Sequence, residues 1–283
     1  MVSDRFVPGG PARMGSSRVA RWPHLGLRSV VTRPYAGITG AIEQPGGFVL
    51  PATASVLLVM KVVDSALRPP QFVHGAHATY ATIDGACAPS YAQVSLAPLG
   101  AYSVLGMPMD ELSGQLVDMH DVLGNAGTGL GDKVRSMATW QERFDEIDRF
   151  LLRRAANGPR VVAPEVAHVW RRLVSSGGAV PIRSLSREVG WSHKHLITRF
   201  TQQLGFAPKR AARLVRFERV LGRLNDGTPV DWGQVAADFG YADQAHLIRD
   251  FGEFAGVSPS AYLACRRSQR EVNSVQDDLA DVS

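Results

Sequence analysis

The chain has 283 residues, 45% of them hydrophobic and 20% charged, which is typical of globular proteins and excludes a disordered or collagen-like chain. The net charge of +5 is unevenly distributed. Residues 160–270 carry 17 basic and 9 acidic side chains, residues 1–159 carry 14 and 13, and residues 271–283 carry none and 4. A basic excess confined to one part of the chain predicts a polyanionic partner for that part.

The cysteine content and the hydropathy of the chain indicate its cellular compartment. Cys87 and Cys265 lie far apart without the spacing of a disulfide framework or a zinc site, which fits a reducing cytoplasm. The longest apolar run, residues 49–63, is too short to span a bilayer, and the N-terminus lacks the apolar core of a signal peptide. We therefore expect a cytoplasmic protein without a membrane segment.

The first half of the chain consists of three stretches of different character. Residues 1–35 are rich in Gly, Pro, Ser and Arg without periodicity, so we expect a disordered arm. Short β-branched or alternating runs between residues 47 and 98, broken by Pro and Gly, predict an antiparallel sheet or small barrel. Helical patterns then follow at residues 101–105, 109–117, 130–138 and 139–154. Residues 36–158 thus form one expected domain of sheet followed by helices, ending at a linker over residues 155–160.

The second half contains one helix-turn-helix pattern twice, after a helix that begins at Pro164. The first copy has Gly190, Leu196 and Phe200, and the second has Gly240, Leu247 and Phe251 in the same order. In each copy glycine ends a short helix, and the Leu/Phe pair four residues apart gives the next helix a buried face. Two helices joined by a short glycine-containing turn allow the second helix to enter a DNA major groove.

A linker helix is expected between the two copies. Residues 208–224 begin with a proline, carry one apolar stripe and display basic side chains on the remaining surface. Such a helix is roughly 25 Å long, so the two recognition helices, at residues 192–203 and 243–252, can lie about one DNA turn apart. One chain can then contact two successive major grooves.

These residues resemble the DNA-binding domain of the AraC/XylS family of bacterial transcription regulators. The resemblance is carried by Gly240-Tyr-Ala-Asp-Gln-Ala-His-Leu-Ile-Arg-Asp-Phe251, followed by Gly256-Val-Ser-Pro-Ser-Ala-Tyr262, and it covers residues 164–267. It implies a sequence-specific regulator, usually an activator that contacts RNA polymerase, with a cupin-like sensor and dimerisation half. The family often carries arginine where this chain has Thr198, with Arg199 one place later. Residues 268–283 form an acidic tail, expected to be flexible.

The predicted DNA contacts follow from which side of each recognition helix faces outward. Gln244 and Arg249 can each form two hydrogen bonds with a base, and Lys194 and Ile197 are expected in the adjacent groove. The alternative for Arg249 is a structural ion pair with Asp243 or Asp250. Arg210, Arg213 and Arg216 of the linker helix are expected to contact phosphate or simply water. The complete predicted set is Ser192, His193, Lys194, Ile197, Thr198, Arg199, Arg210, Arg213, Asp243, Gln244, Ala245, Ile248 and Arg249.

The first half is expected to bind a small-molecule effector or a partner surface. Its candidate lining residues are Phe72, Tyr80, Tyr91 and Tyr102, each equally consistent with core packing. The helix over residues 139–154 has an apolar stripe at Trp140, Phe144, Ile147 and Leu151, which is consistent with a homodimer contact or with packing inside the subunit.

Other chemistry is less well supported by the pattern. His74 and His77 lack the further ligands of a metal site, and residues 124–131 are glycine-rich without the Lys-Ser/Thr of a phosphate loop, so we expect a flexible connection there. No nucleophile-and-base set is present. We therefore expect no enzyme activity, cofactor or metal. The alternatives are an enzyme tethered to nucleic acid by the basic half, and a non-specific architectural DNA binder, which does not need paired recognition helices.

Overall fold

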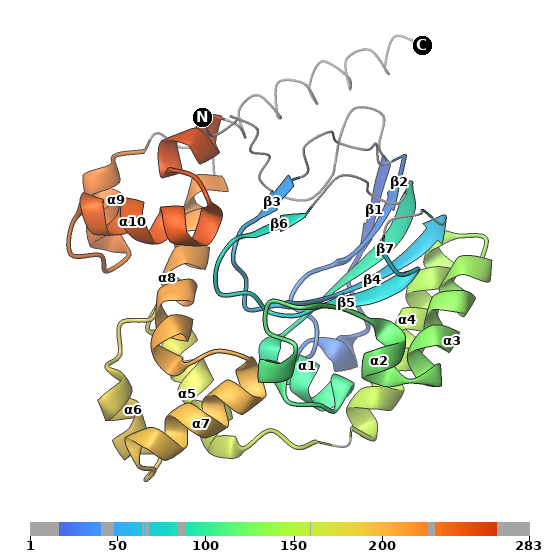
Figure 1. The fold of residues 1–283 in the computed structure, drawn as a ribbon, viewed down its shortest axis with the longest axis horizontal. Coiled ribbons are helices and arrows are strands. Elements are labelled where there is room, and N and C mark those ends of the chain that lie inside the picture. The colour runs from blue at the N-terminus through green and yellow to red at the C-terminus, as the bar shows by residue number, and fades with distance from the viewer. Residues whose placement is uncertain are drawn as a thin grey trace.

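The computed structural model describes residues 17–40, 48–63, 65, 68–83, 89–158, 160–225 and 230–264. A sheet with its covering helices occupies one side of the molecule, and a group of helices around α8 occupies the other (Figure 1). The predicted fold class is confirmed, because an antiparallel sheet and helices precede an all-helical C-terminal part. Cys87 and Cys265 lie outside the described residues.

Six strands form the main sheet, and every pairing in it is antiparallel. Their order is β1-β2-β7-β4-β5-β8, with β1 and β8 at the two edges. The bounds are β1 Ser17–Arg21, β2 Tyr35–Thr39, β4 Val56–Val63, β5 Gln71–His74, β7 Ser90–Leu96 and β8 Leu116–Asp118. A separate pair joins β3 (Phe48–Leu50) to β6 (Ala81–Ile83).

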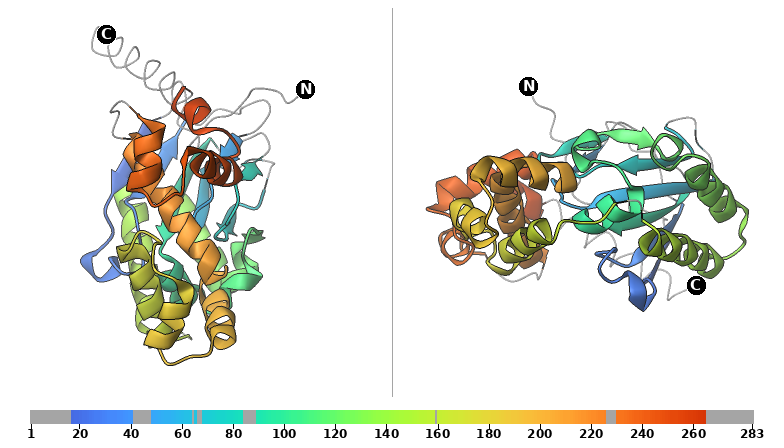
Figure 2. Two further views of the ribbon diagram at one scale, coloured as in Figure 1. Left: turned by 90° about the vertical axis from the view of Figure 1, so that its left-hand side faces the viewer. Right: turned by 90° about the horizontal axis from the view of Figure 1, so that it is seen from below.

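The two faces of this sheet have different neighbours, since successive residues of a strand point to opposite sides. One face carries Leu58, Met60 and Val73, which belong to the main buried core. Helices α1 (Pro98–Leu105), α3 (Asn125–Ser136) and α4 (Trp140–Ala156) cover that face, and the Trp140 ring lies directly over Gly37 of β2. The register places Ile38, Val59 and Tyr91 together on the opposite face. Figure 2 shows these helices along the sheet.

The expectation of a disordered arm over residues 1–35 is wrong for residues 17–35. Strand β1 pairs with β2 along its whole length, and Leu27, Val31 and Tyr35 are buried. A short 3-10 helix, η1 (Leu25–Leu27), follows β1, and the Tyr35 hydroxyl donates to Asp148 of α4 at 2.8 Å. An edge strand with mostly exposed side chains has no apolar alternation, which is why composition alone suggested disorder. Residues 1–16 lie outside the described part.

Two further expectations in the helical layer are corrected. Residues 109–117 do not form a helix: a 3-10 turn, η2 (Met109–Glu111), is followed by Gly114 at φ +69° and by strand β8. The glycine-rich stretch is largely helical, because after α2 (Met119–Leu123) helix α3 begins at residue 125. Its Gly127 and Gly131 lie so close to Met119 and Gln71 that an added Cβ would clash there. Close packing, rather than flexibility, accounts for these glycines.

Helix α4 confirms the helix predicted over residues 139–154 and begins with a capping box formed by Thr139 and Glu142. Its apolar stripe faces the sheet, and Phe144, Ile147 and Leu151 are at most 1% exposed. The stripe is therefore used for packing inside the subunit, and it offers no surface for the homodimer contact that was one alternative for it.

The C-terminal helices agree closely with those predicted. They are α5 (Pro164–Ser175), α6 (Ile182–Glu188), α7 (His193–Leu204), α8 (Pro208–Asn225), α9 (Trp232–Asp238) and α10 (Gln244–Ala255). Helix α8 has 18 residues, about 27 Å at the rise of an α-helix, and it connects the α6–α7 pair to the α9–α10 pair (Figure 1).

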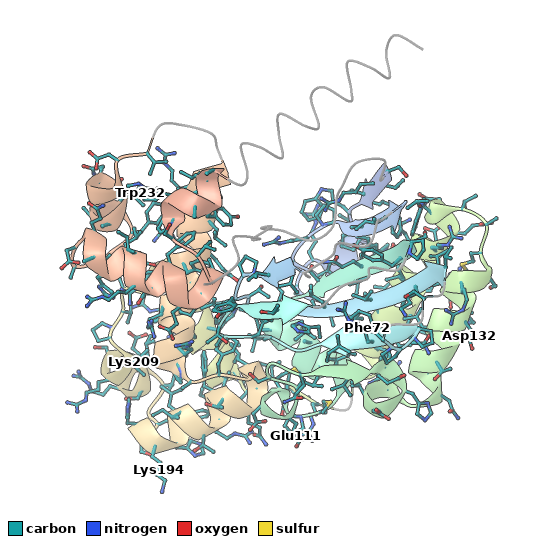
Figure 3. All side chains as sticks on the ribbon, turned by 45° about the horizontal axis from the view of Figure 1, so that its top comes forward. Phe72, Glu111, Asp132, Lys194, Lys209 and Trp232 are labelled. Carbon is teal, nitrogen blue, oxygen red and sulfur yellow. The ribbon has the colours of Figure 1, made fainter. Side chains whose placement is uncertain are left out.

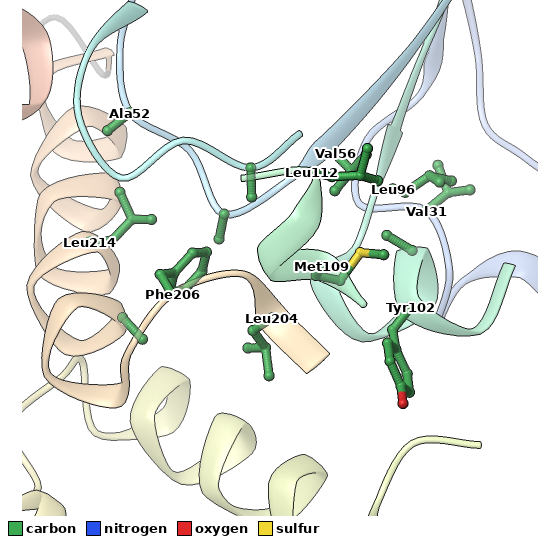
Figure 4. Close-up of a cluster of buried hydrophobic side chains, with 14 of the residues drawn as sticks. Val31, Ala52, Val56, Leu96, Tyr102, Met109, Leu112, Leu204, Phe206 and Leu214 are labelled. Atoms are coloured by element: carbon green, nitrogen blue, oxygen red, sulfur yellow. The ribbon is translucent and has the colours of Figure 1, made fainter. Parts of the chain in front are cut away.

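The core continues from the sheet into the C-terminal helices (Figure 4). Phe206 and Leu204 lie between α8 and the turn that contains Met109. Polar contacts join the same two parts: Glu218 of α8 accepts from the Ala54 amide at 3.2 Å, and the Phe254 carbonyl accepts from the Ala52 amide at 2.7 Å. Burial raises the pKa of the Glu218 carboxyl, although the Ala54 amide opposes this. None of the described helices is long and apolar enough to cross a membrane.

Candidate nucleic-acid interface

The first helix-turn-helix unit is α6 and α7 with the turn between them. Gly190 has φ +69°, a conformation that favours glycine, and the Trp191 amide bonds back to the Ser186 carbonyl at 3.0 Å. Ser192 then caps α7 by accepting from the His195 amide at 3.2 Å. The Trp191 ring meets the His195 ring edge-on at 4.6 Å. The turn is thus specified by glycine, an aromatic residue and a capping hydroxyl.

The second unit, α9 and α10, repeats this geometry. Gly240 has φ +74°, and the Tyr241 amide bonds back to the Ala236 carbonyl at 2.9 Å. Asp243 caps α10 by accepting from the His246 amide at 2.6 Å, and the Tyr241 and His246 rings meet edge-on at 5.2 Å. The side chains of Ser192 and Asp243 therefore have capping roles, whatever else they contact.

Each recognition helix has the predicted inward and outward sides. Leu196, Phe200, Leu247 and Phe251 are at most 1% exposed. The outward positions are exposed or half-buried: Lys194 points away from the domain on α7 (Figure 3), and Ile248 on α10 is 39% exposed. The exposed predicted contacts are Ser192, His193, Lys194, Thr198, Asp243, Gln244, Ala245, Ile248 and Arg249, while Ile197 and Arg199 are half-buried.

Arg249 is available on this surface. Asp243 is used as a cap and Asp250 binds Arg213, so neither acidic neighbour pairs with Arg249 within the described part of the chain. On α7 the position that corresponds to Arg249 is Thr198, and the nearby Arg199 donates to Gln202 at 2.7 Å on its own helix. Of these two arginines, the one in the second unit has the freer guanidinium.

The linker-helix arginines have structural partners in this arrangement. Arg213 donates to Asp250 at 2.7 Å and contacts Glu253, and Arg210 contacts Glu253 and donates to the Ala78 carbonyl at 2.8 Å. Both guanidinium groups also lie over the Phe254 ring, at 4.9 and 5.1 Å from its centre. Contact of Arg210 or Arg213 with phosphate stays a prediction, and it would require these pairs to be exchanged.

Two further arginines of α8 also have structural partners in the second unit. Arg216 donates to the Gly240 carbonyl at 3.0 Å and lies over the Tyr241 ring, and Arg219 lies over the Phe239 ring. Four arginines of α8, Arg210, Arg213, Arg216 and Arg219, therefore contact the turn and the helices of the second unit. The hydrogen bonds that Arg213 donates to Asp250 and Glu253 raise the pKa of its guanidinium.

Exposed basic side chains are more numerous on the first unit than on the second, where Arg249 is exposed. Arg183 and Arg187 of α6 and Lys194 of α7 are exposed, whereas α9 exposes Gln234 and Asp238. Sequence reasoning did not select Arg183 and Arg187. Their place on the first helix of a helix-turn-helix motif, which crosses the DNA backbone, was the signal that could have identified them.

The predicted effector-lining residues do not form one group. Phe72 and Tyr91 share the sheet face opposite the helices, and both are buried. Tyr102 lies in α1 within the main core, on the other side of the sheet. Tyr80 is 45% exposed, and its ring lies against Gly256 at the end of α10. Only Phe72 and Tyr91 can thus face one common site.

His74 and His77 lie together, with ring centres 4.8 Å apart. Burial lowers the pKa of His74 to about 4, with contributions from His77 and Arg68, and burial also lowers the pKa of His77. The Nε2 of His77 is 3.0 Å from the Pro51 carbonyl oxygen. Among the described residues no group of three or more His, Cys, Asp or Glu side chains could hold a metal ion.

Comparison with known proteins identifies the type of domain in the C-terminal half. Residues 185–264 match the family model for a helix-turn-helix domain, which is of the AraC type. Similar solved structures include apo ToxT from Vibrio cholerae, 13% identical with a TM-score of 0.45 over 82% of this chain and 97% of that one. Another is ToxT bound to an unsaturated fatty acid, 12% identical with a TM-score of 0.42 over 86% and 96%. No curated protein matches the sequence. The C-terminal part of this chain is an AraC-type helix-turn-helix domain.

Proposed function

We propose that the chain is a sequence-specific transcription regulator, with activation as its mode and RNA polymerase as its partner at the promoter. The observation that supports this best is the pair of helix-turn-helix units joined by α8. Each unit buries a Leu/Phe pair and exposes the opposite side of its second helix. Two such helices on a rigid connection suit two successive major grooves of double-stranded DNA.

Base recognition is assigned mainly to α10. Gln244 and Arg249 are exposed there, and each side chain can form two hydrogen bonds with one base, Gln with adenine and Arg with guanine. Lys194 and Ile197 of α7 contact the neighbouring groove. The position of α10 as the second helix of a helix-turn-helix unit, with its outward side exposed, supports this division.

The N-terminal half is assigned the sensing role, because it packs tightly against both units without itself carrying the DNA-binding motif. The ToxT proteins with similar folds include forms bound to a fatty acid and to a naphthalenyl butenoic acid. We infer that this chain also responds to a small molecule. A homodimer is a separate proposal, and any contact would have to use a surface other than the buried stripe of α4.

The test is selection of binding sites from a random duplex library by the full chain, followed by footprinting on a selected site. A footprint over two segments about one helical turn apart is expected. A continuous footprint with no preferred sequence would contradict the proposal and favour an architectural binder. Transcription in vitro from a promoter that carries the selected site then decides between activation and repression.

A further inference from the structure

Helices α3 and α4 border a surface cavity that is partly open to solvent. Both helices lie on the side of the molecule away from the helix-turn-helix units (Figure 1). Its volume is about 290 Å³, near the lower limit of ordinary ligand pockets, so it suits a molecule of metabolite size. Leu130 of α3 and Phe150 of α4 form apolar walls. Gly129 also lines the cavity, and a Cβ added there would meet no atom within 4 Å. The absence of a side chain at Gly129 therefore leaves space in the cavity.

The polar wall of the cavity is strongly basic. Glu146 is 1% exposed, and its carboxylate is 3.0 Å from the Lys133 ammonium and 3.9 Å from the Arg153 guanidinium. Arg149 also pairs with this carboxylate. One negative charge thus faces three positive ones, each on a side chain more than half exposed. The surplus charge favours an anion, and the apolar walls favour an apolar body attached to it.

We propose that this cavity binds a small organic anion, a carboxylate on an apolar body of about ten heavy atoms. Lys133 and Arg153 hold the anionic group, since both line the cavity beside Glu146. The body lies between Leu130 and Phe150, over Gly129. Glu146 keeps the two cations in place when the ligand is absent.

A bound ligand at this place can influence the DNA-binding half through Arg154. This residue lines the same cavity and donates to the carbonyls of Val104 at 2.8 Å and Leu105 at 3.3 Å, at the end of α1. Helix α1 in turn packs against α7, the first recognition helix. This coupling rests on the proposed function, whereas binding of the anion does not.

Binding is tested by calorimetry on the full chain without DNA, with three monocarboxylates as probes: phenylacetate, indole-3-acetate and octanoate. At least one should bind, and its neutral amide should bind at least tenfold more weakly, because a charge-assisted hydrogen bond is worth about a factor of ten or more. No binding by any of the three at millimolar concentration, or equal binding of acid and amide, would overturn the proposal.

Variants locate the site. Gly129→Leu fills the cavity and should abolish binding, and Lys133→Gln or Arg153→Gln should weaken it about tenfold or more. Gly222→Leu is the matched control, because Gly222 is also a helical glycine with no atom near an added Cβ but lies in α8. Thermal melting confirms that each variant folds. Binding that survives Gly129→Leu would place the ligand elsewhere, and binding that leaves DNA affinity unchanged would remove only the coupling to α7.

Discussion

In both helix-turn-helix units a glycine at positive φ is followed by an aromatic residue whose amide bonds back to the first helix, yet the two units are held by different forces. The second unit is tied to α8 by half-buried charges: Arg213 binds Asp250, which is 5% exposed. The first unit has an exposed counterpart, in which Glu188 of α6 binds Arg172 and His168 of α5. Its recognition helix packs instead against α1 and η2 of the N-terminal half.

This difference changes how the basic charge of the C-terminal half is understood. Basic side chains along α8 suggest a surface for phosphate, but Arg213, Arg216 and Arg219 are bound to the second unit itself. Exposed basic side chains are more numerous on α6 and α7, with Arg183, Arg187 and Lys194, than on α9 and α10, where Arg249 is exposed. We therefore expect backbone contacts mainly from the first unit and base recognition mainly from the second.

The largest expected effect is on the buried aromatic residues. Phe251→Ala should lower the free energy of unfolding by about 3–5 kcal/mol, as large-to-small changes of a buried Phe do. Phe251 is 1% exposed and packs against the rings of Phe217 and Tyr262 at 5.3 and 5.5 Å. Phe200→Ala is the matched change in the first unit. Urea unfolding measures both, and a loss below about 1.5 kcal/mol for Phe251→Ala would mean that the second unit is not packed as described.

The ion pairs should separate the two units more clearly. Arg213→Ala should cost about 2–3 kcal/mol, because it leaves the buried Asp250 carboxylate without its main partner. Arg172→Ala, which removes the exposed pair of the first unit, should cause no measurable loss. The double variant Arg213→Ala, Asp250→Asn should recover part of the stability. Equal losses for Arg213→Ala and Arg172→Ala would contradict the difference between the units.

A fall in pH should weaken the ion pairs that Glu253 forms with Arg210 and Arg213. Burial favours a higher pKa for the Glu253 carboxyl, but the hydrogen bonds from Arg213 and Arg210 outweigh burial and hold the pKa below its usual 4.5. A carboxyl whose pKa is depressed on folding contributes stability above its unfolded pKa and loses it as pH falls through the folded value. Unfolding measured between pH 6 and pH 3 should therefore depend less on pH in Glu253→Gln than in the wild type.

The positions of the helices were largely predictable from sequence, but the elements against which they pack were not. Periodicity and capping signals placed α4 and α8 to within a few residues, because amphipathic spacing is a local property. The same spacing cannot tell whether a stripe packs within the chain or against another subunit, and the stripe of α4 packs within it. Edge strand β1 was missed, since its stability comes from pairing with β2 and not from its own pattern.

In the candidate site, too, local spacing predicted which positions face outward but not which long-range contacts they form. The outward positions of α7 and α10 follow from the Leu/Phe pairs four residues apart, so Gln244 and Arg249 were identifiable from sequence. The structural role of Arg210 and Arg213 was not, because Asp250, Glu253 and the Ala78 carbonyl lie far from them along the chain. Long-range ion pairs of this kind leave no signal in local spacing.

A smaller effect is expected on base recognition by the second unit. Arg249→Ala should relax the preference at one base pair about tenfold, or roughly 1.4 kcal/mol, within the range of a bidentate contact with guanine. Because Arg249 has no ion pair among the described residues, its loss should leave the melting temperature unchanged. Lys194→Ala should weaken binding with a smaller change of preference. Selection from a site library with a thermal melt measures both quantities, and an unaltered base preference in folded Arg249→Ala would defeat the assignment.

The smallest expected effect concerns phosphate contact by the first unit. Arg187 is exposed on α6, where the first helix of a helix-turn-helix unit approaches the DNA backbone. If it neutralises one phosphate, Arg187→Ala should reduce the slope of log affinity against log salt by about 0.9 and weaken specific and non-specific binding alike. Gln234→Ala is the control, since Gln234 is exposed on α9, the corresponding helix of the second unit, but carries no charge. Fluorescence anisotropy from 50 to 300 mM salt, with a selected and a scrambled duplex, gives both slopes. An unchanged slope for Arg187→Ala, or an equal reduction for Gln234→Ala, would show that phosphate contact is not concentrated on the first unit.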